Sequence, residues 1–149
     1  ELDLAVSYAI PRLGLPAAVS FRRWAEAALS GRIKRADLAL RIVGEREGRA
    51  LNRHYRGRDY ATNVLSFPAE LPPGVKLPIL GDIVMCAPVI AREARQQGKD
   101  LAAHYAHLTV HGVLHLLGWD HDNTTEAEAM ETLERQILDS LGFDDPYAE

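Results

Sequence analysis

The chain has 149 residues, 47% of them hydrophobic, which is enough for one compact domain with a real core and short for two; we expect a single domain over residues 1–149. The single cysteine, Cys86, excludes an internal disulfide and suits a reducing cytoplasm as a small buried side chain. With a net charge of −4, no run of 18 apolar residues and no signal-peptide pattern, we expect a cytoplasmic protein without a membrane span.

The first half of the chain alternates between predicted strands and predicted helices. Apolar and polar residues alternate over Leu2–Tyr8 and over Asp37–Val43, as they do in half-buried strands. A helical pattern follows each strand, over Val19–Leu29 with Ser20 as a candidate N-cap, and over Glu45–Tyr55.

The second half begins with two short apolar strands and then becomes helical. The strands are predicted over Val64–Phe67 and Ile79–Cys86, with a proline-rich loop between them. Three helices follow, over Pro88–Gln97, Leu101–Leu117 and Thr125–Leu141. The last helix is introduced by Asn123 and closed by Gly142. We therefore predict an α+β fold, with a small mixed sheet of about four strands packed with about five helices.

The most informative stretch lies at the end of the fourth predicted helix, where histidines stand at i, i+4 and i+10. His111 and His115 share one helix face, and a chain that reverses at Gly118 can bring His121 to the same ion. Imidazoles favour zinc, with nickel as an alternative occupant in a purified sample. Three protein ligands leave a fourth position open, which is typical of catalytic zinc sites. A structural cluster of polar histidines is the alternative.

Two further histidines, His104 and His107, lie on the same stripe of this predicted helix. From His107 to His115 is about 12 Å along the helix axis, which is too far for three ligands of one ion, whereas an i, i+4 pair spans about 6 Å. Only one adjacent pair can serve, and the position of Gly118 favours His111 and His115.

The spacing also fits the long zinc-peptidase signature H-E-x-x-H-x-x-G-x-x-H, with one difference. In peptidases the Glu after the first His is the general base. Gly112 occupies that position here and cannot move a proton, so an ordinary metallopeptidase mechanism loses its base. Asp120 and Asp122 are the nearest carboxylates that could replace it, and roles as loop residues or as groups that orient a histidine fit them equally well.

The net charge conceals two halves of opposite sign. Residues 12–58 hold 12 Lys and Arg against 4 Asp and Glu, whereas residues 59–149 hold 5 against 15. This asymmetry is compatible with a basic face that meets phosphates, and also with solvated charges that pair with each other. Arg53, Arg56 and Arg58 form the densest basic group, where a guanidinium could hold a phosphate by two-point contact.

Four sequence blocks occur in order: L-N-x-x-Y-R-G from Leu51, A-T-N-V-L-S-F from Ala61, L-G-D-I-V from Leu80 and H-G-V-L-H-L-L-G-W-D-H from His111. This combination resembles the YbeY family of bacterial endoribonucleases and ribosomal RNA maturation factors. The match covers most of residues 37–141. Trp119 stands where the family usually has Tyr, and Asn63 stands at a position that is Asp or Asn in the family.

The resemblance implies a zincin-like, metal-dependent hydrolase domain. It implies a zinc-dependent, single-strand-specific endoribonuclease that acts in 16S rRNA 3′-end maturation and in ribosome quality control. The implied partners are RNA and the small ribosomal subunit, with ribosomal or ribosome-assembly proteins as further candidates.

The resemblance also implies roles for individual residues. One zinc ion per chain would be held by His111, His115 and His121, and Arg56 would be a functional arginine in the cleft. We expect Arg56 to be catalytic. The further candidate substrate contacts are Arg53, Arg58 and Asn63. Ser66 is a candidate hydrogen-bonding group, and a strand-end cap explains Asn63 and Ser66 equally well.

Two alternative functions remain open at this point. One is a metal-dependent hydrolase of another substrate, such as a peptide or a small molecule. The other is a ribosome-associated binding factor in which the metal is structural and its removal melts the fold.

Overall fold

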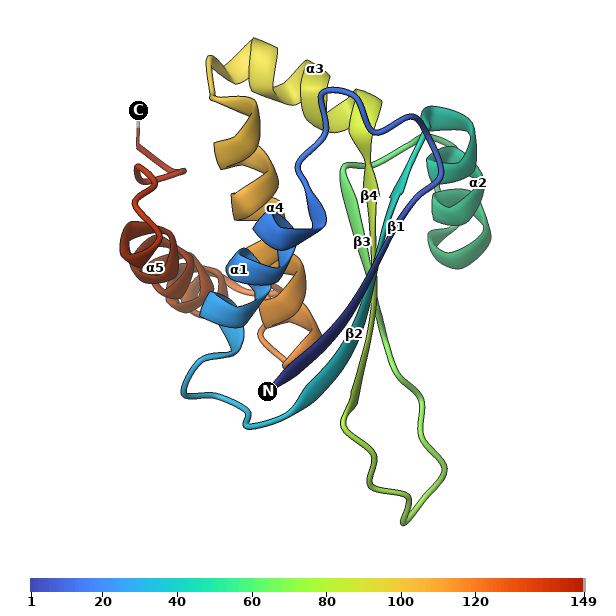
Figure 1. The fold of residues 1–149 in the computed structure, drawn as a ribbon, viewed down its shortest axis with the longest axis vertical. Helices are drawn as coiled ribbons and strands as arrows, with labels where there is room; N and C mark the ends of the chain where they lie inside the picture. Colours follow the sequence, from blue (N-terminus) through green and yellow to red (C-terminus); the bar gives the residue numbers. More distant parts are fainter. Residues whose placement is uncertain (149) are drawn as a thin grey trace.

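One mixed β-sheet organises the computed structural model, which describes residues 1–148 (Figure 1). Within these residues the strands are β1 (Leu2–Tyr8), β2 (Ala36–Val43), β3 (Val64–Pro68) and β4 (Ile79–Cys86). They are arranged in the order β1-β2-β4-β3. Strands β1, β2 and β4 run parallel, and β3 pairs antiparallel with β4 at one edge.

Helices cover both faces of this sheet. Within residues 1–148 they are α1 (Ala18–Leu29), α2 (Glu45–Arg56), α3 (Ala87–Gln97), α4 (Leu101–Leu116) and α5 (Thr124–Ser140). Helices α1, α4 and α5 lie on one side of the sheet and α2 lies on the other, with α3 across the top of the view in Figure 1. None of the helices in this part of the chain combines the length and the apolar character needed to cross a membrane.

The main core lies between the sheet and helices α1, α4 and α5. Phe21 of α1 and Leu114 of α4 are both fully buried there, together with Leu40 of β2 and Met85 of β4. A smaller apolar cluster occupies the other face of the sheet, where Cys86 is buried, as predicted. The sheet is therefore covered on both faces, which leaves its β3 edge and the ends of the neighbouring helices to form a site.

The predicted α+β fold is confirmed, and each predicted strand and helix lies within one residue of its predicted bounds in residues 1–148. The last helix begins as expected, because the Asn123 side chain accepts a hydrogen bond from Glu126 N at 2.9 Å. The prediction of Ser20 as a cap was wrong. Helix α1 begins at Ala18, and the backbone N–H of Ser20 already donates to Ala17 O at 3.0 Å, inside the first turn.

Candidate active site

Helix α4 carries four histidines and ends at the site. At its start the Asp100 carboxylate accepts a hydrogen bond from Ala103 N at 3.2 Å. At its end Gly118 adopts a φ of +101°, a left-handed conformation that favours glycine, and Trp119 N donates to Leu114 O at 3.0 Å. This reversal brings His121 back beside the helix that carries His111 and His115.

The three predicted metal-ligating histidines lie together. The ring centroids of His111 and His115 are 6.2 Å apart, and those of His111 and His121 are 5.7 Å apart. The rings of His115 and His121 are separated by 5.8 Å. These separations place the three rings side by side. Within residues 1–148, however, the group whose ligand atoms all lie within 4.8 Å of one another joins His115 and His121 with Asp120 and does not include His111.

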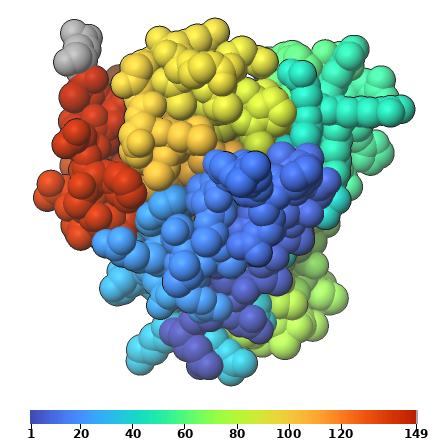
Figure 2. Space-filling view, turned by 45° about the horizontal axis from the view of Figure 1, so that its top comes forward, coloured from blue at the N-terminus to red at the C-terminus, as the bar shows by residue number. Residues whose placement is uncertain are grey.

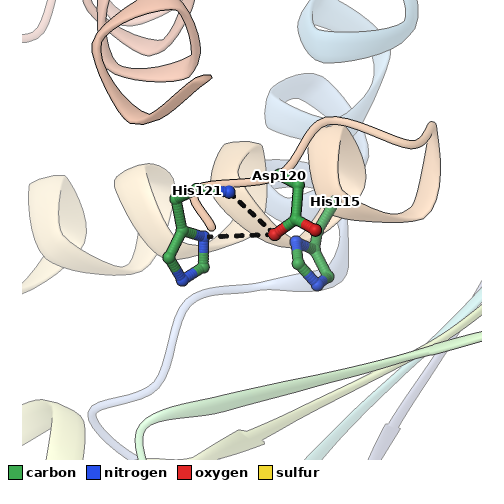
Figure 3. Close-up of side chains that lie close together, drawn as sticks. All are labelled: His115, Asp120 and His121. Carbon is green, nitrogen blue, oxygen red and sulfur yellow. Dashed lines mark hydrogen bonds and ion pairs between the residues drawn. The ribbon is translucent and has the colours of Figure 1, made fainter. Parts of the chain in front are cut away.

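The Asp120 carboxylate joins this group. One ligand atom each of His115, Asp120 and His121 lies within 4.8 Å of the other two, so this cluster could hold a metal ion. Figure 3 shows the carboxylate between the two imidazole rings. Asp120 also accepts a hydrogen bond from His121 N at 2.7 Å, which lowers the pKa of Asp120. A hydrogen bond to Asp120 raises the pKa of neighbouring Asp122, so the two carboxyl groups differ in their proton affinity.

A buried carboxylate that the sequence patterns did not reveal lies behind His111. Glu134 of α5 is 0% exposed and accepts hydrogen bonds from His111 Nδ1 at 2.6 Å and from His107 Nε2 at 3.0 Å. The Tyr147 hydroxyl donates a third. Burial raises the pKa of Glu134, but these hydrogen bonds outweigh it and lower the pKa to about 2. His111 is bound at Nδ1 and keeps Nε2 for another ligand.

The two upstream histidines of α4 are buried away from this group. His104 is 4% exposed, and its Nε2 lies 2.9 Å from Glu93 Oε1. Burial lowers the pKa of His104, which favours its neutral form. Since His107 bonds to Glu134, both upstream rings already have carboxylate partners, and α4 presents His111 and His115 at the cleft.

The histidines face a cleft of about 610 Å³ between α4, the edge strand β3 and the end of α2. Arg56, the last residue of α2, is exposed and lines this cleft, while its catalytic role stays a prediction. Tyr55 and Phe67 form an aromatic wall, with ring centroids 5.0 Å apart in an edge-to-face arrangement. Tyr55 is 61% exposed, so the wall is open to a ligand.

The structure does not bring Arg53 and Arg58 into the lining of the histidine cleft. Arg53 lines a neighbouring hollow on α2, where its Nη1 lies 4.0 Å from Asp59 Oδ1. The Nη1 of Arg58 donates to the Tyr60 hydroxyl at 3.5 Å. Tyr60 borders the hollow that contains Arg53, so the two arginines lie beside the cleft rather than in it.

Asn63 and Ser66 both line the histidine cleft, but their polar atoms already have partners. The amide nitrogen of Asn63 donates to Glu93 Oε1 at 3.0 Å, and its Oδ1 accepts a hydrogen bond from Val64 N at the start of β3. The Ser66 hydroxyl donates to Gly112 O at 3.3 Å. These contacts tie the edge strand to its neighbouring helices.

Gly112 lies where α4 packs closely against β3 and β4. A Cβ at this position would lie 3.1 Å from Ile83 Cδ1 and 3.3 Å from Ser66 Oγ. A glutamate there would therefore need its neighbours to move. The glycine that removes the peptidase base is also the residue that allows the helix to approach β3 and β4.

Comparisons with known proteins show the family to which the chain is similar. The family model described as Endoribonuclease YbeY matches residues 17–142. The protein named Endoribonuclease YbeY from Stenotrophomonas maltophilia strain K279a is 74% identical over 152 residues, covering 99% of this chain and 94% of its own. The protein of the same name from Xanthomonas oryzae pv. oryzae strain MAFF 311018 is 72% identical with the same coverage.

A solved structure supports the fold independently of these sequence matches. The solution structure of TM1509 from Thermotoga maritima is similar over 98% of this chain and 99% of that chain, with a TM-score of 0.62 and 21% identity. The match extends over nearly the whole chain, so the two proteins share a fold. The histidine motif and the three upstream blocks all fall within the residues that the family model matches, and the chain belongs to the YbeY endoribonuclease family.

Proposed function

We propose that this protein is a zinc-dependent endoribonuclease that cleaves single-stranded RNA and acts in 16S rRNA 3′-end maturation and ribosome quality control. Membership of a nuclease family supports the hydrolysis of phosphodiester bonds. The observation that carries the proposal is the grouping of three imidazoles with one arginine, Arg56, in a single cleft. The ribosomal role, the small subunit as partner and a cytoplasmic location follow from the family resemblance.

The proposed metal ligands are His111, His115 and His121, and the donor set fits zinc because it is dominated by imidazole nitrogens. A bound zinc ion supplies a Lewis acid towards a phosphoryl oxygen and makes water more acidic. His111 contributes Nε2, because Glu134 occupies its Nδ1. Nickel is an alternative occupant in a purified sample, since imidazole also suits nickel.

Two side chains of the cleft are proposed to act on the reacting phosphate. The Arg56 guanidinium stabilises the negative charge that grows on the phosphoryl oxygens, and its planar fork suits two-point contact. Asp120 is proposed to accept a proton from an attacking water, because it lies between His115 and His121 and its lowered pKa keeps the carboxylate ionised. In this proposal Asp120 serves as the general base, the role that glutamate has in the zinc peptidases.

The lining of the cleft and the hollow beside it support a single-stranded RNA substrate. Unpaired bases can stack on exposed aromatic rings such as Tyr55, whereas bases inside a duplex cannot. We propose that the RNA backbone continues past Arg58 into the hollow that contains Arg53. Asn63 contributes to the wall of the cleft beside the scissile bond.

Cleavage assays on matched substrates test this proposal. Zinc-loaded protein should cut a fluorescent single-stranded RNA, cut the same sequence more slowly in a perfect duplex, and leave casein intact. The His115→Ala protein, purified in parallel, should lose RNA cleavage, which controls for contaminating nucleases. RNA cleavage that persists in His115→Ala at the unchanged rate would contradict the proposed site.

The same assays separate the proposal from its two alternatives. Casein cleavage without RNA cleavage would indicate a hydrolase of another substrate. No cleavage at all, combined with loss of the fold when zinc is removed, would indicate a binding factor with a structural metal.

A further inference from the structure

We propose that Glu134 is a positioning residue that holds the His111 ring with Nε2 directed to the metal, and that Tyr147 holds Glu134 in place from the C-terminal segment. This inference rests on the proposed metal site, and it assigns roles to two residues outside the histidine motif. Neither residue lines the histidine cleft, so each acts through another side chain.

The hydrogen bonds of Glu134 fix the orientation of its carboxylate. Its Oε2 accepts from His111 Nδ1 at 2.6 Å, while Oε1 accepts from His107 Nε2 at 3.0 Å and from the Tyr147 hydroxyl. Because the two oxygens have donors on different sides, the carboxylate cannot turn without breaking a bond. The His111 ring is therefore held with Nδ1 towards the core and with the opposite nitrogen towards the cleft.

Burying Glu134 costs hydration free energy that a residue needed only for packing would not have to lose. The side chain is completely buried on α5, where Met130 and Leu138, one helical turn away on either side, are each 1% exposed. A buried carboxylate loses several kcal/mol of hydration that its partners must restore, whereas an apolar residue of similar volume would not. Histidines that bind metals commonly donate their second nitrogen to a carboxylate, which sets the ring orientation and strengthens the ligand.

The C-terminal segment supplies Tyr147, whose hydroxyl donates a hydrogen bond to Glu134. Figure 2 shows the C-terminal residues, in red, lying beside the first turns of α4, in gold. The Tyr147 ring packs edge-to-face on His107 at 5.2 Å between centroids, and the Arg135 guanidinium lies 5.1 Å from the Tyr147 ring centroid. Tyr147 N also donates to Asp145 Oδ1 at 2.8 Å, so the tyrosine is held from several directions.

Zinc affinity of the folded protein tests the proposal without relying on activity. We expect Glu134→Gln to bind zinc about 10- to 100-fold more weakly than the unchanged protein in competition with a chromophoric chelator. Glutamine keeps the size of the side chain but loses its negative charge. Its amide NH₂ group would also face a group that donates a hydrogen bond to Glu134 in the unchanged protein. Glu128→Gln is the matched control, because Glu128 lies on the same helix and is exposed, and it should bind zinc like the unchanged protein.

A second variant covers the case in which Glu134→Gln does not fold, which circular dichroism in the presence of chelator will show. Tyr147→Phe removes one hydroxyl and leaves the His111–Glu134 bond in place. We expect this variant to fold and to bind zinc several-fold more weakly, because Glu134 loses one of its three donors.

The outcomes separate this inference from the proposed function. Unchanged zinc affinity in both folded variants, even with a lower melting temperature, would show that Glu134 is merely structural and would overturn the positioning role alone. If the unchanged protein itself bound no zinc, the metal site would be overturned, and this inference with it.

Discussion

The two halves of helix α4 carry the same residue type on the same stripe, yet their histidines have different surroundings. In the first half, His104 is buried beside Glu93 and His107 is buried beside Glu134. In the second half, His111 and His115 line an open cleft, and the turn after Gly118 adds a third ring. Their helical spacing does not distinguish them; their burial and their access to the cleft do.

This comparison shows how one helix can combine stability with chemistry. In the first half, each imidazole bonds to a carboxylate through Nε2 while its Nδ1 is buried without a partner, and neither ring lines the histidine cleft. An imidazole at a cleft, with its second nitrogen directed outward, is available to an ion. His111 stands at the boundary, because one of its nitrogens bonds to Glu134 while its ring lines the cleft.

The largest effect is expected from Arg56→Ala, which removes the charge that faces the second half of α4. We expect kcat on single-stranded RNA to fall by about 10²- to 10³-fold, the usual cost of losing one group that stabilises charge in the transition state. Zinc content should stay unchanged, since Arg56 is not among the proposed ligands. Full activity in this variant, measured with the His115→Ala protein as the blank, would remove Arg56 from the mechanism.

The next largest effect is a difference in the free energy of unfolding between a variant in the first half of α4 and a variant at the cleft. His107→Ala leaves the buried Glu134 carboxylate with one partner fewer, and we expect the free energy of unfolding to fall by about 3 kcal/mol. His121→Ala should change it by less than about 0.5 kcal/mol, because that side chain is 57% exposed. Urea denaturation of both proteins in chelator provides the values. Equal losses in the two variants would erase the distinction between the halves.

A smaller loss of stability is expected from substitutions at Gly112, which follows His111 and packs against the sheet. Restoring the peptidase pattern with Gly112→Glu forces a charged side chain between α4 and the sheet, and we expect a loss of about 2 kcal/mol. Gly112→Ala should lose less, because only one carbon must be accommodated. Thermal unfolding of both proteins tests this, together with a casein assay in which neither should gain peptidase activity. A Gly112→Glu protein as stable as the unchanged one would show that the interface is loose.

The smallest effect is expected outside the cleft, at Arg53. If the RNA backbone continues into the hollow on α2, Arg53→Ala should weaken binding of a long RNA and reduce the slope of log K against log salt by about 0.7. Binding of a short RNA that fills only the cleft should not change. Arg35→Ala is a suitable control, because Arg35 is exposed and precedes β2, whereas α2 follows the other end of that strand. An unchanged slope would restrict the substrate to the cleft.

The sequence predicted the elements of the fold well because each has a strong local signal. Alternation defined β1 and β2, and the glycine and histidine spacing predicted the end of α4. The order of the strands has no such signal, since it depends on which elements pack together. Ser20 misled because a capping residue type also occurs inside the first turn of a helix.

The site was only partly predictable for a related reason. His111, His115 and His121 lie within eleven residues of one another, whereas Glu134 reaches His111 through the packing of a separate helix. Its one local signal is a charged residue on an apolar stripe beside Met130 and Leu138. Such a residue shows that a partner exists without showing which.

Three neighbouring arginines lie in different surroundings because of their places on α2 and on the turn that follows it. Arg56 ends α2 and lines the cleft, and Gly57 follows it with a φ of +68°. The chain changes direction there, so Arg58 points to Tyr60 instead, while Arg53 lies one helical turn earlier on α2. Of these three arginines, Arg56 lines the cleft, Arg53 lines the neighbouring hollow, and Arg58 lines neither.

Zinc stoichiometry tests the central claim most directly. The unchanged protein, His104→Ala and His115→Ala would each be loaded with zinc, desalted and measured by inductively coupled plasma mass spectrometry alongside protein concentration. We predict one zinc per chain in the unchanged protein and in folded His104→Ala, and none in His115→Ala. Zinc retained by His115→Ala, or lost from folded His104→Ala, would contradict the assignment of the metal to the second half of α4.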